Sequence, residues 1–331
     1  MDMTERRVAI YGSGRTAGEL VKELRHSRHV LAAAIVHSAR RAGQDLGVLT
    51  IGEPIGVTAT ADLDAALRSR TFDLLLYVGL TGERHAAVMA ACADAGIDMV
   101  HACFVHPRVA LEGELYRRLA DRAAATGARI VGTGMIPGLW LDVLPSLLSS
   151  GLPAPVSVRG RRLSDISSWG SDVLRQELGV GSKQTGASPR IDLILRESAH
   201  VIADALGLAE FSCETRGGFV QAEAPGKVGE IDVLAGQVEG FRQEFVIVPA
   251  GQERVRLEWT GLANVASRVS GSGKAEPVEI TMAGGDGSRI ELRVNPPLDP
   301  YPGTAARMVG AVTAIGSLSP GLHPTTALPV A

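Results

Sequence analysis

The stretch Val8–Gly18, which reads V-A-I-Y-G-S-G-R-T-A-G, decides the fold of this chain. The apolar run Val8–Tyr11 predicts a buried strand, and the residues after Gly18 have the spacing of an amphipathic helix. A glycine turn between a strand and a helix is the context in which G-x-G-x-x-G/A binds a dinucleotide. Gly12 would permit the tight turn, and Gly14 would let main-chain amides reach a pyrophosphate. The alternative is a strand-turn-helix with incidental glycines.

The sequence of this turn also indicates which of its residues would contact the cofactor. Ala17 and Gly18 are small enough for the helix to pack close to the strand. The residues of the turn that we expect at the cofactor are Gly12, Gly14, Arg15, Thr16 and Ala17.

Composition fits an ordinary globular protein of 331 residues, which is long enough for two domains with their own cores. Hydrophobic residues make up 45% and charged residues 21%. A net charge of −3 gives no electrostatic reason to expect nucleic acid or an anionic membrane as partner. No apolar run approaches the ~18 residues that span a bilayer. The start of the chain shows no signal-peptide pattern. The three cysteines, Cys92, Cys103 and Cys213, lack the spacing of a zinc site, and their odd number argues against a disulfide framework. We therefore expect a cytoplasmic protein.

Strand and helix signals alternate over the first 130 residues, which is typical of a doubly wound parallel sheet. The glycines at 96 and 127 suit helix ends. We expect an N-terminal Rossmann domain over residues 1–142. Besides the first strand, the predicted strands are Val30–Val36, Asp73–Val78, Met99–Val105 and Arg129–Gly132, and the clearest helices are Glu83–Ala95 and Glu112–Thr126.

The pattern changes after Pro145. Residues 151–230 are glycine-rich and mixed, with one helix around Pro189–Leu206. Short alternating runs follow, separated by turns, and these predict antiparallel strands. The runs are Ile231–Leu234, Gln243–Val248, Val255–Thr260, Val278–Met282 and Ile290–Val294. We expect a second, α+β domain over residues 143–299, built on a mostly antiparallel sheet. Residues 300–331, which include a predicted helix over Thr304–Ile315, are expected to return to the first domain.

The end of the second strand indicates which nicotinamide cofactor binds. An NAD-specific domain usually presents Asp or Glu there, but this chain has Ser38, Arg40 and Arg41. Guanidinium groups pair with phosphate through charge-assisted hydrogen bonds, so the sequence favours NADP(H) over NAD(H). The alternative is that both arginines only solvate the start of a helix. Gly79 and Thr81, after a later strand, are expected near the nicotinamide.

Three further stretches carry a family resemblance: G-Q-D-L-G at 43–47, G-T-G-M-I-P-G-L-W-L-D at 132–142 and P-G-T-A-A-R-M-V at 302–309. With the N-terminal turn, they resemble the dihydrodipicolinate-reductase-like superfamily, and most of all 2,4-diaminopentanoate dehydrogenase and the native amine dehydrogenases. The resemblance implies a Rossmann domain and an α+β domain that covers substrate and forms a homodimer. It also implies nicotinamide-dependent interconversion of an amine with a ketone or imine.

Two departures from that family matter. The related amine dehydrogenases carry an acidic residue before the proline that matches Pro107, where this chain has Ala102 and Cys103. Ile136 stands where the family's junction motif has asparagine. We therefore expect an NADPH-dependent oxidoreductase that is similar to imine or carbonyl reductases. It would transfer a hydride to or from the C=N or C=O carbon of a partly hydrophobic small molecule. The alternatives are a non-redox Rossmann enzyme (a lyase or cyclase) and an inactive NADP(H)-binding protein.

Candidate catalytic residues are His106 and His101, because an imidazole titrates near pH 6.5 and both precede Pro107 near the expected nicotinamide. Either could instead be structural. Cys103 is a nucleophile only if its thiolate is stabilised, and otherwise a small buried residue. Asp142 either orients substrate or caps the helix that follows. The expected substrate pocket comprises Cys103, Ile136, Leu139, Trp140, Asp142, Trp169, Thr304 and Met308.

Overall fold

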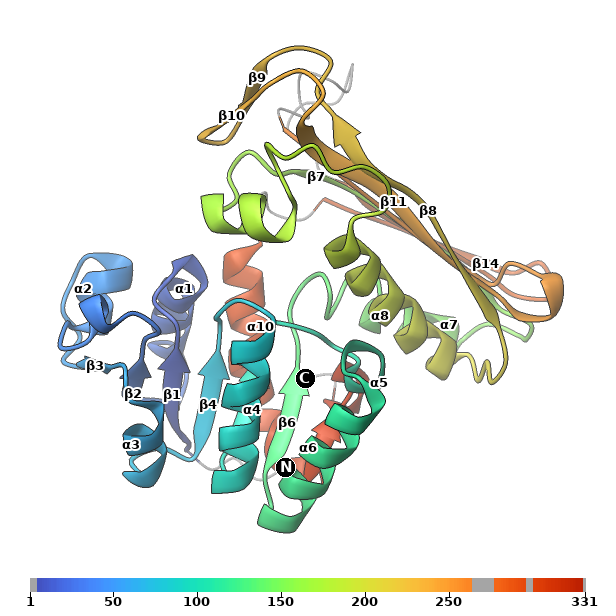
Figure 1. Cartoon of the computed structure of the whole chain (residues 1–331). Coiled ribbons are helices and arrows are strands. Elements are labelled where there is room, and N and C mark those ends of the chain that lie inside the picture. The colour runs from blue at the N-terminus through green and yellow to red at the C-terminus, as the bar shows by residue number, and fades with distance from the viewer. Residues whose placement is uncertain (1–4, 264–276, 296–299, 330–331) are drawn as a thin grey trace. The chain divides into compact units, whose positions relative to one another are not determined.

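The computed structural model describes residues 5–263, 277–295 and 300–329, and this part of the chain forms two compact units (Figure 1). The first unit comprises Met1–Gly138 together with Asp299–Ala331, and the second comprises Leu139–Leu298. Each unit is built on its own main sheet.

The first unit contains a seven-stranded sheet in the order β15-β6-β5-β4-β1-β2-β3, with every neighbouring pair parallel. This is the doubly wound α/β architecture that the sequence predicts. The strands are β1 (Arg7–Tyr11), β2 (Val30–Ile35), β3 (Ala59–Thr60), β4 (Leu74–Tyr77), β5 (Asp98–His101), β6 (Arg129–Gly132) and β15 (Gly321–His323).

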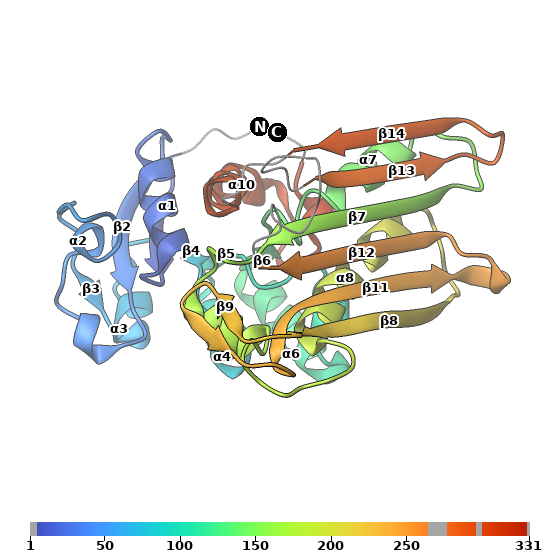
Figure 2. The ribbon, with the colours of Figure 1, turned by 90° about the horizontal axis from the view of Figure 1, so that it is seen from above.

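Helices cover both faces of this sheet (Figure 2). One face packs against α1 and α10 through a core that includes Leu20, Val21, Met308 and Val312. The other face packs against α3, α4 and α6, with Met89 and Leu119 fully buried. The helices of this unit are α1 (Arg15–Leu24), α2 (Leu46–Ile51), α3 (Leu63–Arg68), α4 (Glu83–Ala95), α5 (Pro107–Ala110), α6 (Gly113–Thr126) and α10 (Tyr301–Ala314), with the 3-10 turns η1 (Ala39–Arg41), η4 (Ile315–Ser317) and η5 (Thr325–Ala327).

The predicted helix ends are confirmed. Helix α4 has the predicted bounds, and Gly96 caps it with a left-handed φ of 66°. Gly127 caps α6 in the same way with φ 87°. A left-handed φ is accessible to glycine at little cost, which explains why both helices end there.

One prediction about this sheet is wrong, and its edge strand β15 was not predicted. The strand predicted over Met99–Val105 ends at His101, because the chain turns and brings the Phe104 carbonyl against the backbone of Gly132. Beyond β6, the edge strand β15 comes from the C-terminal segment and pairs with β6 in parallel. Strand β15 is only three residues long and gives no strand pattern of its own in the sequence.

The second unit contains a six-stranded sheet in the order β14-β13-β7-β12-β11-β8. All neighbours are antiparallel except β7 and β12, so the predicted mostly antiparallel sheet is confirmed. Helix α8 packs against β11 and β12. The elements are α7 (Val143–Ser149), β7 (Ser157–Asp165), the π-helical turn η2 (Val173–Glu177), α8 (Pro189–Ala205), β8 (Ser212–Gln221), β9 (Gly226–Val228), β10 (Ile231–Val233), β11 (Val238–Val248), the 3-10 turn η3 (Pro249–Gly251), β12 (Val255–Leu262), β13 (Val278–Ala283) and β14 (Arg289–Val294).

The sequence does not reveal the central strand β7. Its buried positions alternate as expected for a strand but include Gly160, Arg162 and Ser164, so the apolar alternation is missing. The predicted strand Ile231–Leu234 forms as β10, but it pairs with β9 in a separate two-stranded ribbon. Among the described residues, no helix combines the length and apolarity needed to cross a membrane.

Candidate functional site

The glycine turn between β1 and α1 has the geometry of an anion-binding loop. Gly12 has φ 135°, and a Cβ there would lie 3.0 Å from Cγ2 of Val78, so only glycine fits. A Cβ on Gly14 would meet nothing within 4 Å, which leaves its main chain open to a ligand. Gly14 offers no side-chain cap, and the first turn of α1 contains no acidic residue. The amides at the start of α1 are therefore suited to a phosphate.

The two small residues that follow have different roles. Ala17 is buried in the core beneath the sheet, as the predicted close packing requires. Gly18 instead allows α2 to pack closely against α1, since a Cβ at residue 18 would lie 2.9 Å from the carbonyl oxygen of Thr50. The close approach predicted between Gly18 and the strand is therefore made to a neighbouring helix.

A positively charged group reaches the turn from the end of β2. Arg41, in η1, donates from Nη1 to Oγ of Ser13 at 2.7 Å and to its carbonyl oxygen at 3.2 Å. Ser38 caps η1 by accepting the Arg40 amide proton at 3.3 Å, and Arg40 is exposed. Within the described residues both side-chain bonds of Arg41 use the same nitrogen, so Nε and Nη2 are available to a ligand.

The segment that follows η1 is held by one carboxylate. Asp45 accepts backbone N–H groups from Gly47, Val48 and Ile55 at Oδ1 and from Gly56 at Oδ2. Desolvation acts to raise the pKa of Asp45, but these four hydrogen bonds outweigh it and lower the pKa below its usual value. The G-Q-D-L-G stretch thus fixes the start of α2 and the loop beside η1.

Aromatic side chains line the carboxyl edge of the sheet next to the turn. Tyr11, Tyr77 and His101 are the last residues of β1, β4 and β5 and pair in register across the sheet. The two tyrosine rings stack with their centroids 4.9 Å apart. The ring centroid of His85, in α4, lies 4.8 Å from that of Tyr77 and 4.6 Å from that of His101. Sequence reasoning missed Tyr11, Tyr77 and His85, although Tyr11 ends a predicted strand directly before Gly12 and Tyr77 lies next to the last residue of another predicted strand.

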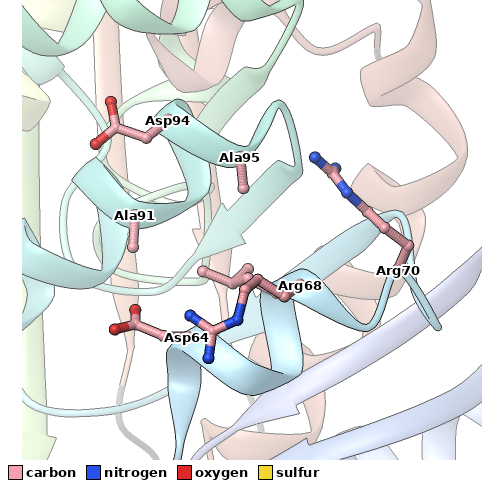
Figure 3. A pocket seen from close by; sticks show the side chains of 7 residues that line it. Asp64, Arg68, Arg70, Ala91, Asp94 and Ala95 are labelled. Carbon is pink, nitrogen blue, oxygen red and sulfur yellow. The ribbon is translucent and has the colours of Figure 1, made fainter.

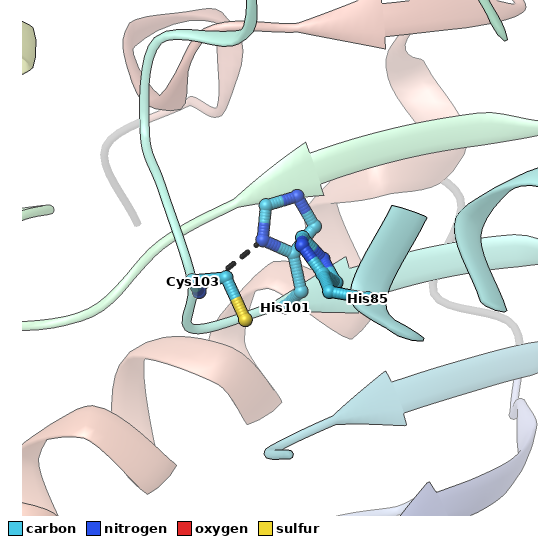
Figure 4. A group of neighbouring side chains, drawn as sticks. All are labelled: His85, His101 and Cys103. Carbon is cyan, nitrogen blue, oxygen red and sulfur yellow. Dashed lines mark hydrogen bonds between the residues drawn. The ribbon is translucent and has the colours of Figure 1, made fainter. Parts of the chain in front are cut away.

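His101 is held as a neutral imidazole. It is fully buried, and burial together with the neighbouring His85 lowers its pKa well below the usual value. Its Nδ1 accepts the backbone N–H of Cys103 at 3.3 Å, which places the ring proton on Nε2 (Figure 4). Nε2 is buried and has no hydrogen-bond partner among the described residues. His101 is therefore equipped to donate a hydrogen bond but not to carry a positive charge.

His85, His101 and Cys103 offer ligand atoms that all lie within 4.8 Å of one another, and all three are buried. Two histidines and a thiol suit zinc, whose ligand bonds of roughly 2.0–2.3 Å would need closer spacing. A metal at Nδ1 of His101 would replace the Cys103 amide, and a metal at Nε2 would move the ring proton to Nδ1, where it opposes that amide. The observed hydrogen bond therefore favours a packed, metal-free arrangement of these side chains.

The other residues predicted near the nicotinamide lie at the same edge. A Cβ on Gly79 would lie 2.6 Å from the Tyr77 hydroxyl, so this glycine makes room for a ring of the protein itself. Tyr77 donates to the Leu80 carbonyl at 2.8 Å, and Cys103 Sγ lies 3.8 Å from the Gly79 carbonyl. Thr81 is half-buried. Cys103 is only 3% exposed, which fits the buried role better than the nucleophilic one.

His106 begins α5 at its N-cap position and is 6% exposed. The loop that carries it is fastened by the C-terminal segment, because Thr325 N donates to the Val105 carbonyl at 2.9 Å. His106 and His101 thus lie on one short segment of the first unit, on either side of the turn that ends β5.

The predicted pocket residues are divided between the two units. Ile136 is in the first unit, in a loop that packs against the start of α10, where a Cβ on Gly134 would lie 3.8 Å from Cγ2 of Thr304. Met308 is fully buried in the α1–α10 core. The second unit contains the remaining four: Leu139, Trp140, Asp142 and Trp169.

Asp142 does cap a helix. Its Oδ1 accepts the Val143 amide at 2.6 Å, and its Oδ2 accepts the Ser198 hydroxyl at 3.0 Å. Trp169 is half-buried, with its ring 6.0 Å from that of Trp259. Trp259 is buried and donates to Ser164 at 3.0 Å.

A shallow depression between α3 and α4 lies away from this site (Figure 3). Arg70 precedes β4 and Ala95 precedes β5, so the depression opens at the amino ends of the strands, opposite the glycine turn. Ligands of doubly wound sheets bind at the carboxyl ends, so we do not assign it a role in the reaction. Its lining is Asp64, Leu67, Arg68, Arg70, Ala91, Asp94 and Ala95.

Comparison with known proteins identifies the fold. No family model and no curated protein matches the sequence. Among solved structures, an amine dehydrogenase from Mycobacterium smegmatis has a TM-score of 0.81 at 22% identity, covering 99% of this chain and 97% of its own. A dipicolinate-bound dihydrodipicolinate reductase from Paenisporosarcina sp. TG-14 has a TM-score of 0.53 at 14% identity (96% and 97% covered). A biliverdin reductase from Synechocystis sp. PCC 6803, in complex with biliverdin and NADP+, has a TM-score of 0.55 at 13% identity (94% and 91% covered). These likenesses confirm the fold that the sequence resemblance implies, a Rossmann-like α/β domain with a second domain built on a mostly antiparallel sheet.

Proposed function

We propose that this protein is an NADP(H)-dependent oxidoreductase that transfers a hydride to or from the carbon of a C=N or C=O group. The observation that supports this most directly is the glycine turn: open main chain at Gly14, uncapped amides at the start of α1, and Arg41 held beside Ser13. The three structural neighbours are named as an amine dehydrogenase and two reductases, and the biliverdin reductase is in complex with NADP+.

The preference for a 2′-phosphate follows from charge at the end of β2. The segment from Ile35 to Arg41 contains no carboxylate to accept the ribose hydroxyl. It supplies Ser38, Arg40 and Arg41 instead, and Arg41 is already directed toward the turn. A planar guanidinium with free donors pairs with phosphate in a bidentate manner.

We assign different roles to the two histidines at the edge of the sheet, His101 and His106. His101 is neutral and would act by donating a hydrogen bond from Nε2. His106 is our candidate for the group that supplies or removes a proton. The nicotinamide, when bound, supplies the hydride. The protein would position the acceptor carbon and polarise its oxygen or nitrogen.

The substrate is expected to have hydrophobic bulk. Ile136, Leu139 and Trp140 supply apolar side chains, and Ala102 and Cys103 replace the acid that would pair with a bare ammonium group. Burying an unpaired charge costs several kcal/mol. A neutral carbonyl or a substituted imine therefore fits these residues better than a small diamino acid. We retain the expectation of a homodimer, which light scattering would test.

The test has two steps. Isothermal titration calorimetry with NADPH, NADP+, NADH and NAD+ measures binding, and NADPH absorbance then measures turnover on panels of ketones, aldehydes and imines. We expect NADPH to bind most tightly and to be oxidised with at least one carbonyl or imine class. No binding of any pyridine nucleotide would contradict the proposal. Tight binding without turnover on any panel would favour the inactive NADP(H)-binding protein.

A further inference from the structure

We propose that Tyr77 is a positioning residue for the nucleotide site, because its hydrogen bond to the Leu80 carbonyl holds the loop of residues 78–82 in place beside the glycine turn. This inference rests on the proposed binding of a nicotinamide dinucleotide. Tyr77 is the last residue of β4, and its hydroxyl donates to the Leu80 carbonyl oxygen at 2.8 Å. The side chain at the end of the strand is thus bonded to the backbone of the loop that follows it.

The loop 78–82 lies directly beside the glycine turn. Strands β1 and β4 pair in parallel, so the loops that follow them leave the same edge of the sheet (Figure 1). Val78 N donates to the Tyr11 carbonyl at 3.0 Å, and a Cβ on Gly12 would lie 3.0 Å from Cγ2 of Val78. The first residue of the loop therefore packs against the first residue of the turn, and the position of the loop shapes the site that the turn forms.

This loop is on the nicotinamide side of the turn. Strands β2 and β3 lie on one side of β1, whereas β4, β5 and β6 lie on the other, and a dinucleotide binds across such a switch point. The end of the second strand holds the adenosine ribose, so the nicotinamide half extends over β4. Leu80 has a side chain that is 43% exposed at this place. We therefore expect the loop to contact the nicotinamide half and not the adenosine half.

The ring that carries the hydroxyl is held firmly by its neighbours. Tyr77 is fully buried, and its ring centroid lies 4.9 Å from that of Tyr11 and 4.8 Å from that of His85. Burial raises the pKa of the Tyr77 phenol, so the hydroxyl stays protonated near neutral pH and remains a donor. The core of the first unit thereby fixes the position of an exposed residue, Leu80.

Gly79 is required for this contact. A Cβ on Gly79 would lie 2.6 Å from the Tyr77 hydroxyl oxygen and 2.7 Å from Cζ of the same ring, so a side chain there would displace either the ring or the loop. A loop that is already ordered loses less conformational entropy when a ligand binds. Tyr77 would therefore raise affinity by preorganisation, and it would do so without touching the nucleotide, because it is fully buried.

The experiment combines amide hydrogen exchange of the full chain with calorimetry of NADPH, NADH and adenosine 2′-monophosphate, which lacks the nicotinamide half. Tyr77→Phe keeps the ring and removes only the hydroxyl. We expect faster exchange in the loop 78–82 and an affinity for both dinucleotides that is about three- to tenfold lower, with adenosine 2′-monophosphate unchanged. Tyr116→Phe is the matched control, because Tyr116 lies on α6 beside Arg108 and should change neither quantity.

Gly79→Ala tests the same contact from the side of the loop. Its methyl group would collide with the Tyr77 hydroxyl, so we expect a loss of affinity for the dinucleotides and none for adenosine 2′-monophosphate. Adding Tyr77→Phe to Gly79→Ala should cause little further loss, since the hydrogen bond is already broken. Circular dichroism melting checks that each variant is folded at the temperature of the titrations, and Gly79→Ala decides the question if Tyr77→Phe does not fold.

Four results would overturn the inference: unchanged exchange of the loop in Tyr77→Phe, unchanged dinucleotide affinity in that variant, an equal loss of affinity for adenosine 2′-monophosphate, or losses in Tyr77→Phe and Gly79→Ala that add in full. If the unsubstituted chain binds NADPH and Tyr77→Phe binds it equally well, only this inference fails. If the unsubstituted chain binds no dinucleotide, the proposed function fails, and this inference fails with it.

Discussion

Arg41 and Ser13 connect the end of β2 to the glycine turn through two hydrogen bonds from one guanidinium nitrogen, of 2.7 Å and 3.2 Å. The sequence separates these residues by 28 positions. The contact holds a cation beside the turn before any ligand arrives, and so it gives a structural basis for choosing between cofactors.

Arg41→Ala should therefore change cofactor preference. Hydrogen bonds to charged groups contribute about 1.5–3 kcal/mol, so NADPH affinity should fall about 10- to 100-fold while NADH affinity changes little. Calorimetry with both cofactors measures this. Arg25→Ala serves as the matched control, because Arg25 is exposed and pairs with Glu53 at the far end of α1. Equal losses for both cofactors would contradict the phosphate assignment.

His106→Asn should lower turnover while leaving NADPH affinity nearly unchanged. A positioned general acid or base typically contributes about 100-fold or more to the rate. Steady-state kinetics on whichever carbonyl or imine is turned over, together with calorimetry, separates the two effects. The exposed His26, substituted in the same way, should have no effect. Wild-type turnover in His106→Asn would remove this residue as the proton donor.

His101 should make stability depend on pH below neutrality. Its pKa is lowered in the folded state, so below about pH 6.5 the unfolded chain binds a proton that the folded chain does not. Stability should therefore be complete above about pH 6.5 and decline as the pH falls, by at most about 1.4 kcal/mol per pH unit for this one proton.

Thermal melting between pH 7.5 and 5 measures that decline, and His101→Gln should make it shallower. His29, whose pKa is lowered by burial and by Arg28, acts in the same direction, so His29→Gln should give a separate, additive reduction. An identical pH profile in His101→Gln would show that this imidazole is not held neutral.

Asp98→Asn should destabilise the first unit without affecting the cofactor site. Asp98 is 4% exposed and accepts from Arg6 Nη2 at 2.6 Å and from the Arg129 amide at 2.8 Å. Loss of this charge should lower the free energy of unfolding by about 2 kcal/mol, measured by urea denaturation. NADPH affinity should be unchanged, because Asp98 begins β5 at the edge opposite the glycine turn. Asp94→Asn, which breaks an exposed pair with Arg122, should cost less than about 1 kcal/mol.

Parts of the candidate site could be predicted because they depend on local sequence. The motif around Gly12 and Gly14 predicts the turn because Gly12 adopts a φ that favours glycine, and the glycines that cap α4 and α6 act through their own backbone. The position of His106 before Pro107 is likewise readable. The ring contacts of Tyr301 with Arg15 and of His85 with His101 were missed because the partners lie on different helices and strands, and neither Tyr301 nor His85 lies in a recognisable motif.

The same distinction holds for the sheets. Strands whose buried positions are all apolar, such as β4, are evident from sequence, since their hydrophobic run is continuous. Strand β7 is not evident, because its inward positions include Arg162 and Ser164, which are accommodated by the Arg162–Ser164 and Trp259–Ser164 hydrogen bonds. Polar residues are tolerated inside only when partners satisfy them. One of these partners, Trp259, comes from the neighbouring strand β12, so the sequence of β7 alone does not show it.

The doubly wound first unit, the mostly antiparallel character of the second sheet and the place of the glycine turn were all predictable from the sequence, because hydrophobic period and glycine conformations are local properties. The strand β7 and its parallel pairing with β12 were not. Only the tertiary structure decided that Arg41 lies on Ser13, that Arg15 stacks on Tyr301, and that His101 is buried as a neutral imidazole. Those facts depend on which distant residues lie side by side in the folded chain and, for His101, on its complete burial.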